Sequence, residues 1–67
     1  MGERIKSRRE ELGLSQRELA DRCGVSSAMI CWIERGSKSP SVQLGCIIAQ
    51  ILGVTVSWLV GIDESAI

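Results

Sequence analysis

The sequence predicts an all-α fold, a compact bundle of five short helices that forms a single domain. The chain has 67 residues, which is too short for more than one domain. A helix-start signal, in which a glycine is followed by an apolar residue and then by a serine or threonine, occurs three times. No segment alternates between polar and apolar residues for long enough to indicate a strand.

The expected helices follow from these start signals. Ser15 and Glu18 have the spacing of a capping box, with Leu14 and Leu19 at the positions of a hydrophobic staple. Other serines and a threonine can cap later helices in the same way. The signals predict helices over about Glu3–Leu12, Gln16–Cys23, Ser27–Arg35, Val42–Leu52 and Val56–Val60. Apolar residues at helical spacing are expected to face inward in the first three helices, namely Ile5, Leu12, Leu19, Ala20, Cys23, Ile30 and Ile33. The fourth helix carries the apolar residues Leu44, Ile47, Ile48 and Ile51.

The composition argues against an enzyme and against a metal site. The chain has no histidine, which removes the commonest general base and the commonest zinc ligand. Its three cysteines cannot all pair with one another, and their spacing matches no metal or redox motif. We expect them to be buried small hydrophobic residues in a reducing cytoplasm. The sequence thus indicates a binding module that has no cofactor.

Charge is unevenly distributed along the chain. All eight basic residues lie within Met1–Lys38, together with six of the eight acidic ones, and the run Ser39–Ile62 has no charge. The apolar stretch Val42–Val60 has the length of a membrane span, which leaves a membrane-tethered peptide as an alternative. Gly53 interrupts that stretch, and we favour two short helices with one broad apolar surface.

The two helices on either side of Gly24-Val25-Ser26 predict a helix-turn-helix. A turn of three residues forces its two helices to pack at a steep angle. That packing requires a small residue where the helices touch, a glycine in the turn and apolar residues that close the angle from the second helix. The chain supplies Ala20, Gly24, Ile30 and Ile33 at these positions.

The chain resembles the Cro and phage-repressor type helix-turn-helix family of bacterial and phage transcriptional regulators, and most of all the DNA-binding domains of lambdoid-phage repressors. The resemblance covers nearly the whole chain. It rests on Gly2-Glu3-Arg4-Ile5, Leu12-Gly13-Leu14-Ser15-Gln16, Gly24-Val25-Ser26, Ile30 with Ile33-Glu34-Arg35-Gly36, Pro40-Ser41, Leu52-Gly53-Val54 and Trp58-Leu59. It implies a five-helix repressor-type bundle that binds operator DNA as a homodimer.

By this resemblance, the third helix lies in the major groove as the recognition helix. The residues expected to contact bases are Ser27, Ala28, Cys31 and Trp32. Ala28 and Trp32 depart from the family, which often has polar base readers at these positions. Trp32 can contact DNA, anchor a protein partner, or fold back onto its own helix.

The resemblance also implies contacts to DNA phosphates, which position the domain. We expect them from Arg9, Gln16, Arg17, Arg35, Ser37 and Lys38. Arg9 and Glu34 match a family pair that faces the DNA backbone, and the alternative is an ordinary surface ion pair. Arg4, Lys6 and Arg8 have acidic neighbours, so a solvated helix face is the expectation for them.

The uncharged second half is expected to carry the dimer interface. The predicted contacts are Val56, Trp58, Val60 and Ile62, with Trp58 and Leu59 as core residues in the alternative interpretation. Many phage repressors carry a self-cleaving second domain, for which 67 residues are too few. If the chain is complete, release from DNA must come from weak dimerisation, turnover or a partner.

These features predict a sequence-specific binder of double-stranded DNA. It would be a transcriptional repressor that acts as a homodimer on a palindromic operator, in the bacterial cytoplasm and on the nucleoid. The alternative is a protein-interaction module, such as an antitoxin or a repressor that an antirepressor inactivates.

Overall fold

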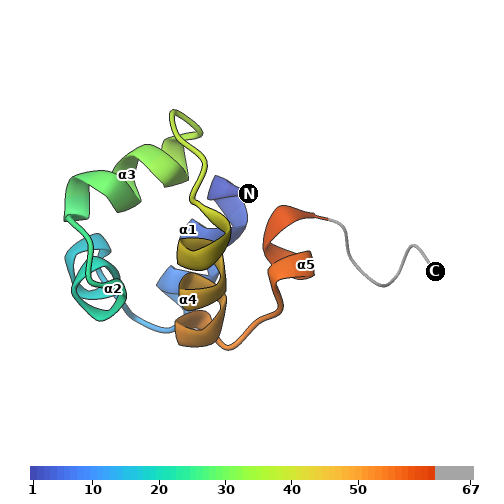
Figure 1. Ribbon diagram of the computed structural model, residues 1–67. Helices are drawn as coiled ribbons and strands as arrows, with labels where there is room; N and C mark the ends of the chain where they lie inside the picture. The colour runs from blue at the N-terminus through green and yellow to red at the C-terminus, as the bar shows by residue number, and fades with distance from the viewer. Residues whose placement is uncertain (62–67) are drawn as a thin grey trace.

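The computed structural model describes residues 1–61 and contains five helices (Figure 1). These are α1 (Gly2–Glu11), α2 (Gln16–Cys23), α3 (Ser27–Arg35), α4 (Val42–Leu52) and α5 (Val56–Val60). No strand occurs among the described residues. The all-α prediction is confirmed, and α1 lies one residue earlier at each end than expected.

Side-chain caps start four of the five helices. Ser15, Ser26, Ser41 and Thr55 each accept a hydrogen bond from the amide three residues later, at 3.0–3.2 Å. The Ser15 amide in turn donates to Glu18 Oε1 at 2.9 Å, which completes the predicted capping box. These local bonds place the helix starts at the residues that the sequence indicated.

The core consists of aliphatic side chains from all five helices. Its fully buried members are Ile5, Leu19, Ile30, Ile33, Ile48, Leu52 and Leu59. The prediction that Leu12 faces inward is wrong, because Leu12 is 43% exposed. Helix α1 ends at Glu11 and the chain turns at Gly13, so Leu12 leaves the apolar stripe and Leu14 is buried instead. On α4, Leu44, Ile47 and Ile51 are only half-buried.

Two arginines of α1 tie the second half of the chain to the first. Arg8 Nε donates to the Leu52 carbonyl at 2.9 Å, and Arg4 Nη1 donates to the Trp58 carbonyl at 3.0 Å. The last carbonyls of a helix lack partners within that helix, so these bonds satisfy the ends of α4 and α5. The expected solvated face is therefore wrong for Arg4 and Arg8, while Lys6 is exposed as predicted.

The apolar stretch Val42–Val60 is divided between two helices. Gly53 ends α4 with a left-handed φ of 70°, and Thr55 starts α5. None of the helices within residues 1–61 is both long enough and apolar enough to cross a membrane. The division follows from the glycine and the threonine cap, as the sequence indicated.

Candidate nucleic-acid interface

Helices α2 and α3 form a helix-turn-helix. In Figure 1, α2 is seen nearly end-on and α3 lies across the view. Gly24 ends α2 with a φ of 74°, and the Val25 amide donates to the Ala20 carbonyl at 3.0 Å. Ala20 is 1% exposed, so the small side chain lies buried on α2, as the packing requires.

Helix α3 has a buried inner face and an exposed outer face. Ile30 and Ile33 are buried in the core, which fixes the rotation of the helix. The predicted base-contact residues lie on the opposite side, where Ser27, Ala28 and Trp32 are exposed and Cys31 is half-buried. The structure thus brings these four side chains onto one face of α3.

A buried hydrogen-bonded network links α1, α2 and α3. Arg9 bonds Glu34 with two nitrogens, Nε at 2.7 Å and Nη2 at 3.1 Å, and donates from Nη1 to the Leu14 carbonyl at 2.7 Å. Gln16 Nε2 donates to the same carboxylate at 3.0 Å. Both side chains of the ion pair are at least nine-tenths buried. The network fixes the C-terminal turn of α3 relative to the start of α2.

The burial of Arg9 changes its expected role. Its side chain is 9% exposed, so the alternative of an ordinary surface ion pair is wrong. The hydrogen bond to Glu34 raises the pKa of Arg9 above its usual value. Because its donors point into the protein, Arg9 orients Glu34 and Gln16. A direct contact between Arg9 and phosphate stays a prediction.

The other predicted phosphate ligands lie at the ends of α2 and α3. Gln16 is half-buried at the start of α2, beside the exposed Arg17, while Arg35, Ser37 and Lys38 are exposed at the end of α3. The Lys38 ammonium lies over the Trp32 ring, 5.1 Å from its centroid. This contact was not predicted from the sequence, although the two residues are only six positions apart, on either side of Gly36.

The predicted dimer residues lie in different environments. Val56 and Val60 are each 40% exposed, whereas Trp58 is half-buried and Arg4 lies over its ring at 5.1 Å. The ring of Trp58 packs against the core, and Leu59 is a core residue. Ile62 lies outside the described residues.

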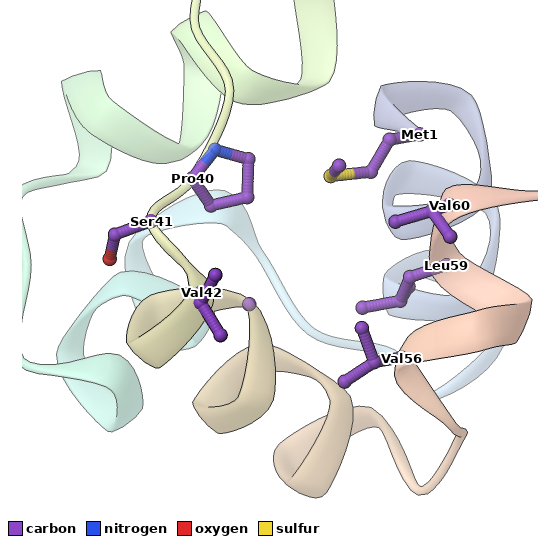
Figure 2. Close-up of a pocket in the computed structure, with 8 residues that line it drawn as sticks. Met1, Pro40, Ser41, Val42, Val56, Leu59 and Val60 are labelled. Carbon is purple, nitrogen blue, oxygen red and sulfur yellow. The ribbon is translucent and has the colours of Figure 1, made fainter.

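An apolar groove of about 150 Å³ lies between the start of α4 and α5, as Figure 2 shows. Its lining residues are Met1, Pro40, Ser41, Val42, Gly45, Val56, Leu59 and Val60. Val42 is 86% exposed at its edge. The groove thus lies between part of α4 and the residues of α5 that the sequence analysis assigned to the dimer surface.

The cysteines follow the prediction only in part. Cys23 is buried, and burial raises the pKa of its thiol. Cys31 is half-buried and Cys46 is exposed, so the expectation of burial is wrong for Cys46. It lies on the face of α4 that points away from the core. Within residues 1–61, no cluster of three His, Cys, Asp or Glu side chains could hold a metal ion.

The short turn, the buried inner face of α3 and its exposed outer face define a helix-turn-helix protein. The model of the helix-turn-helix family matches residues 5–59. The chain belongs to this family of DNA-binding transcriptional regulators. An uncharacterised HTH-type transcriptional regulator of Methanothermobacter thermautotrophicus is 49% identical over 49 residues, which cover 73% of this chain and 71% of that protein.

Two relatives have solved structures in complexes. The c2 repressor of phage P22, crystallised with a synthetic operator, has a TM-score of 0.89 and 31% identity over 92% of this chain and 94% of that one. The regulator SinR of Bacillus subtilis is 38% identical over 65 residues, 96% of this chain. The present chain spans 57% of the length of SinR. The complex of SinR with SinI gives a TM-score of 0.84 at 34% identity, over 98% of this chain and 65% of that one.

Proposed function

We propose that this protein is a transcriptional repressor that binds a palindromic operator as a homodimer. Helix α3 enters the major groove with Ser27, Ala28, Cys31 and Trp32 toward the bases. Gln16, Arg17, Arg35, Ser37 and Lys38 contact the flanking phosphates, and Arg9 holds Glu34 and Gln16 in place. The site of action is genomic DNA in the cytoplasm.

The observation that carries this proposal is the outer face of α3. It is exposed on a helix whose inner face is fixed by Ile30, Ile33 and the buried Arg9–Glu34 pair. Cationic side chains lie at both ends of the motif, with Arg17 in the first turn of α2, Arg35 at the end of α3 and Lys38 after it. A rigid helix with cations at its borders fits a groove lined by phosphates.

Dimerisation follows from the small size of this face. One short helix offers few base contacts, and two copies on a two-fold axis read half-sites about 34 Å apart. The exposed Val56 and Val60, with Val42 at the edge of the groove, supply an apolar surface for the second copy. The match to the P22 c2 repressor, crystallised with an operator, supports operator binding by this chain.

Selection from a random duplex library with the purified chain tests the proposal. We expect enrichment of a palindrome with half-sites about one helical turn apart. Arg35→Ala should reduce the slope of log K against log salt by about 0.9, the value for one phosphate contact. Lys6→Ala, an exposed residue of α1, is the control and should leave that slope unchanged. Enrichment of single half-sites would contradict the dimer, and a flat salt response would contradict the phosphate contacts.

Sedimentation of the free protein tests the dimer surface. A charge placed in an apolar interface opposes association, so Val60→Glu should shift the protein toward the monomer. Gln50→Glu adds the same charge at an exposed position of α4 and serves as the matched control. Equal dissociation of both variants would place the interface elsewhere.

A second function has one observation in its favour. Trp32 is 41% exposed, and exposed tryptophans often anchor protein partners. SinR, which is similar to this chain, has been crystallised with SinI. An inactivating protein of the antirepressor kind would, in this case, bind the chain and displace it from DNA. Release of the selected duplex on addition of a host lysate would support this function.

A further inference from the structure

The outer face of α3 is poor in groups that read bases by hydrogen bonding. From Ser27 to Ile33, its side chains offer the Ser27 hydroxyl, the Cys31 thiol and the single N–H donor of the Trp32 indole, and no amide, carboxylate or guanidinium group. Glu34 is turned inward to Arg9 and Gln16. Bidentate hydrogen bonds from Asn, Gln or Arg, the usual means of distinguishing bases in the major groove, are therefore not available in this stretch.

An apolar strip takes their place. Ala28 and Trp32 are four residues apart, so they are neighbours on the surface of the helix, and both are exposed. The major groove presents one kind of apolar group, the C5-methyl group of a pyrimidine, which thymine carries and cytosine lacks. The apolar atoms of this strip can distinguish bases through that methyl group.

The chain after α3 folds back onto Trp32 and holds it. Gly36 adopts a φ of 81°, and the amides of Ser37 and Lys38 both donate to the Trp32 carbonyl, at 2.9 and 3.3 Å. The Lys38 ammonium lies over the indole ring, 5.1 Å from its centroid. A cation over the face of a tryptophan is attracted to it, and the attraction restricts the ring while its remaining surface stays exposed.

We infer that α3 reads C5-methyl groups of pyrimidines through Ala28 and Trp32, with Lys38 as the residue that positions the Trp32 ring. The inference rests on the proposed function and names what the recognition helix selects. Operator half-sites carry thymine opposite the strip, and the large apolar area of the indole excludes water from around the methyl group. In this position Lys38 can also bind the phosphate that flanks this base.

Parallel selections test the inference. One random duplex library contains thymine, and a second contains uracil in every thymine position, which removes only the C5-methyl groups. We expect an enriched half-site with an invariant thymine from the first library, and loss of preference at that position from the second. On the selected duplex, uracil at that position should weaken binding about fourfold per methyl group, which corresponds to about 0.8 kcal/mol.

Variants assign the effect to the strip. Trp32→Ala should lower the thymine-to-uracil affinity ratio to the part that Ala28 supplies, while circular dichroism stays unchanged because the Trp32 side chain is exposed. Lys38→Ala should lower the ratio by releasing the ring, and Lys38→Arg should restore it, because arginine also stacks on indole. Gln50→Ala, at an exposed position of α4, is the control and should keep the wild-type ratio.

A third library, with 5-methylcytosine in place of cytosine, separates the two sources of the methyl group. If thymine and 5-methylcytosine are both enriched at that position, α3 recognises the methyl group alone. If only thymine is enriched, α3 recognises the methyl group together with the hydrogen-bonding edge of thymine. Equal affinity for thymine and uracil duplexes overturns the inference while the operator stands. If Trp32→Ala also binds DNA like the wild type, the Trp32 side chain makes no contact with DNA. Absence of any enriched sequence overturns the proposed function and the inference with it.

Discussion

The charged helices α1, α2 and α3 and the uncharged helices α4 and α5 are held together by different interactions. Helices α1, α2 and α3 are linked by the buried Arg9–Glu34 pair and its bond to Gln16. Helices α4 and α5 carry no charged residue and pack through aliphatic side chains. They are tied to α1 by Arg4 and Arg8, which bond the last carbonyls of α5 and α4.

The difference shows that the basic residues of the first half have two distinct uses. Arg4, Arg8 and Arg9 bond partners within the fold, whereas the sequence predicted a solvated face for Arg4 and Arg8 and a phosphate contact for Arg9. Arg17, Arg35 and Lys38 are exposed at the ends of the helix-turn-helix. The direction of each charge, and not the number of charges, therefore defines the surface that can meet a polyanion.

The largest effect is expected at the ionic link of the first half. Glu34→Ala leaves the buried Arg9 without its partner and should lower the free energy of unfolding by about 3–5 kcal/mol. That is comparable to the whole stability of so small a domain. Because the variant is expected to be largely unfolded in water, urea unfolding should be followed in the presence of trimethylamine N-oxide, an osmolyte that stabilises the folded state.

Glu11→Ala is the matched control for Glu34→Ala. Glu11 lies 3.8 Å from Arg8 in a pair that is open to solvent, with 62% of its side chain exposed. Its removal should change the free energy of unfolding by less than about 0.5 kcal/mol. If both variants unfold at the same urea concentration, the buried pair contributes no more to the free energy of unfolding than the surface pair does.

The apolar half should respond to changes in packing. Ile48 is fully buried on α4, and Ile48→Val should cost about 0.5–1.5 kcal/mol because it removes one buried methylene. Val42→Ala, at a position that is 86% exposed, should change stability by less than about 0.5 kcal/mol. Urea midpoints measure both, and a larger loss for Val42→Ala would mean that its groove is already covered in the free protein.

Most of the fold could be predicted because its signals are local. Capping side chains, glycines at helix ends and helical apolar spacing each involve neighbours in sequence, and they placed four of the five helices at their observed bounds. The turn of three residues and Ala20 then determined how α2 and α3 meet. Leu12 was misplaced because apolar periodicity alone does not show where a helix stops.

The site was predicted less completely because its contacts join residues far apart in sequence. The pairing of Arg9 with Glu34 was anticipated from a family resemblance, but its burial was not. The bonds from Arg4 and Arg8 to carbonyls of α5 and α4 leave no sequence pattern, since any residue supplies a carbonyl. The position of Lys38 over Trp32 likewise depends on how the chain turns after Gly36.

A smaller effect is expected where the two halves meet. Arg8→Ala removes the hydrogen bond to the Leu52 carbonyl and should lower the free energy of unfolding by about 0.5–1 kcal/mol, since the side chain is partly exposed. Amide hydrogen exchange should rise first in the last turn of α4. Lys6→Ala, two residues away on an exposed part of α1, should leave both measurements unchanged. Faster exchange throughout the domain would indicate that Arg8 supports the whole core.

The smallest effect belongs to the capping box of α2, and it depends on pH. The hydrogen bond from the Ser15 amide lowers the pKa of Glu18 below its ordinary value of 4.5. A carboxylate whose pKa is lowered by folding contributes stability above its unfolded pKa and loses it as the pH falls through the folded pKa. Glu18→Gln keeps an oxygen that can accept this bond and removes the titration. The loss of stability between about pH 5 and pH 3 should therefore be shallower in Glu18→Gln than in the wild type. Parallel urea titrations at each pH measure this difference, and identical slopes would show that α2 begins equally well without the charge.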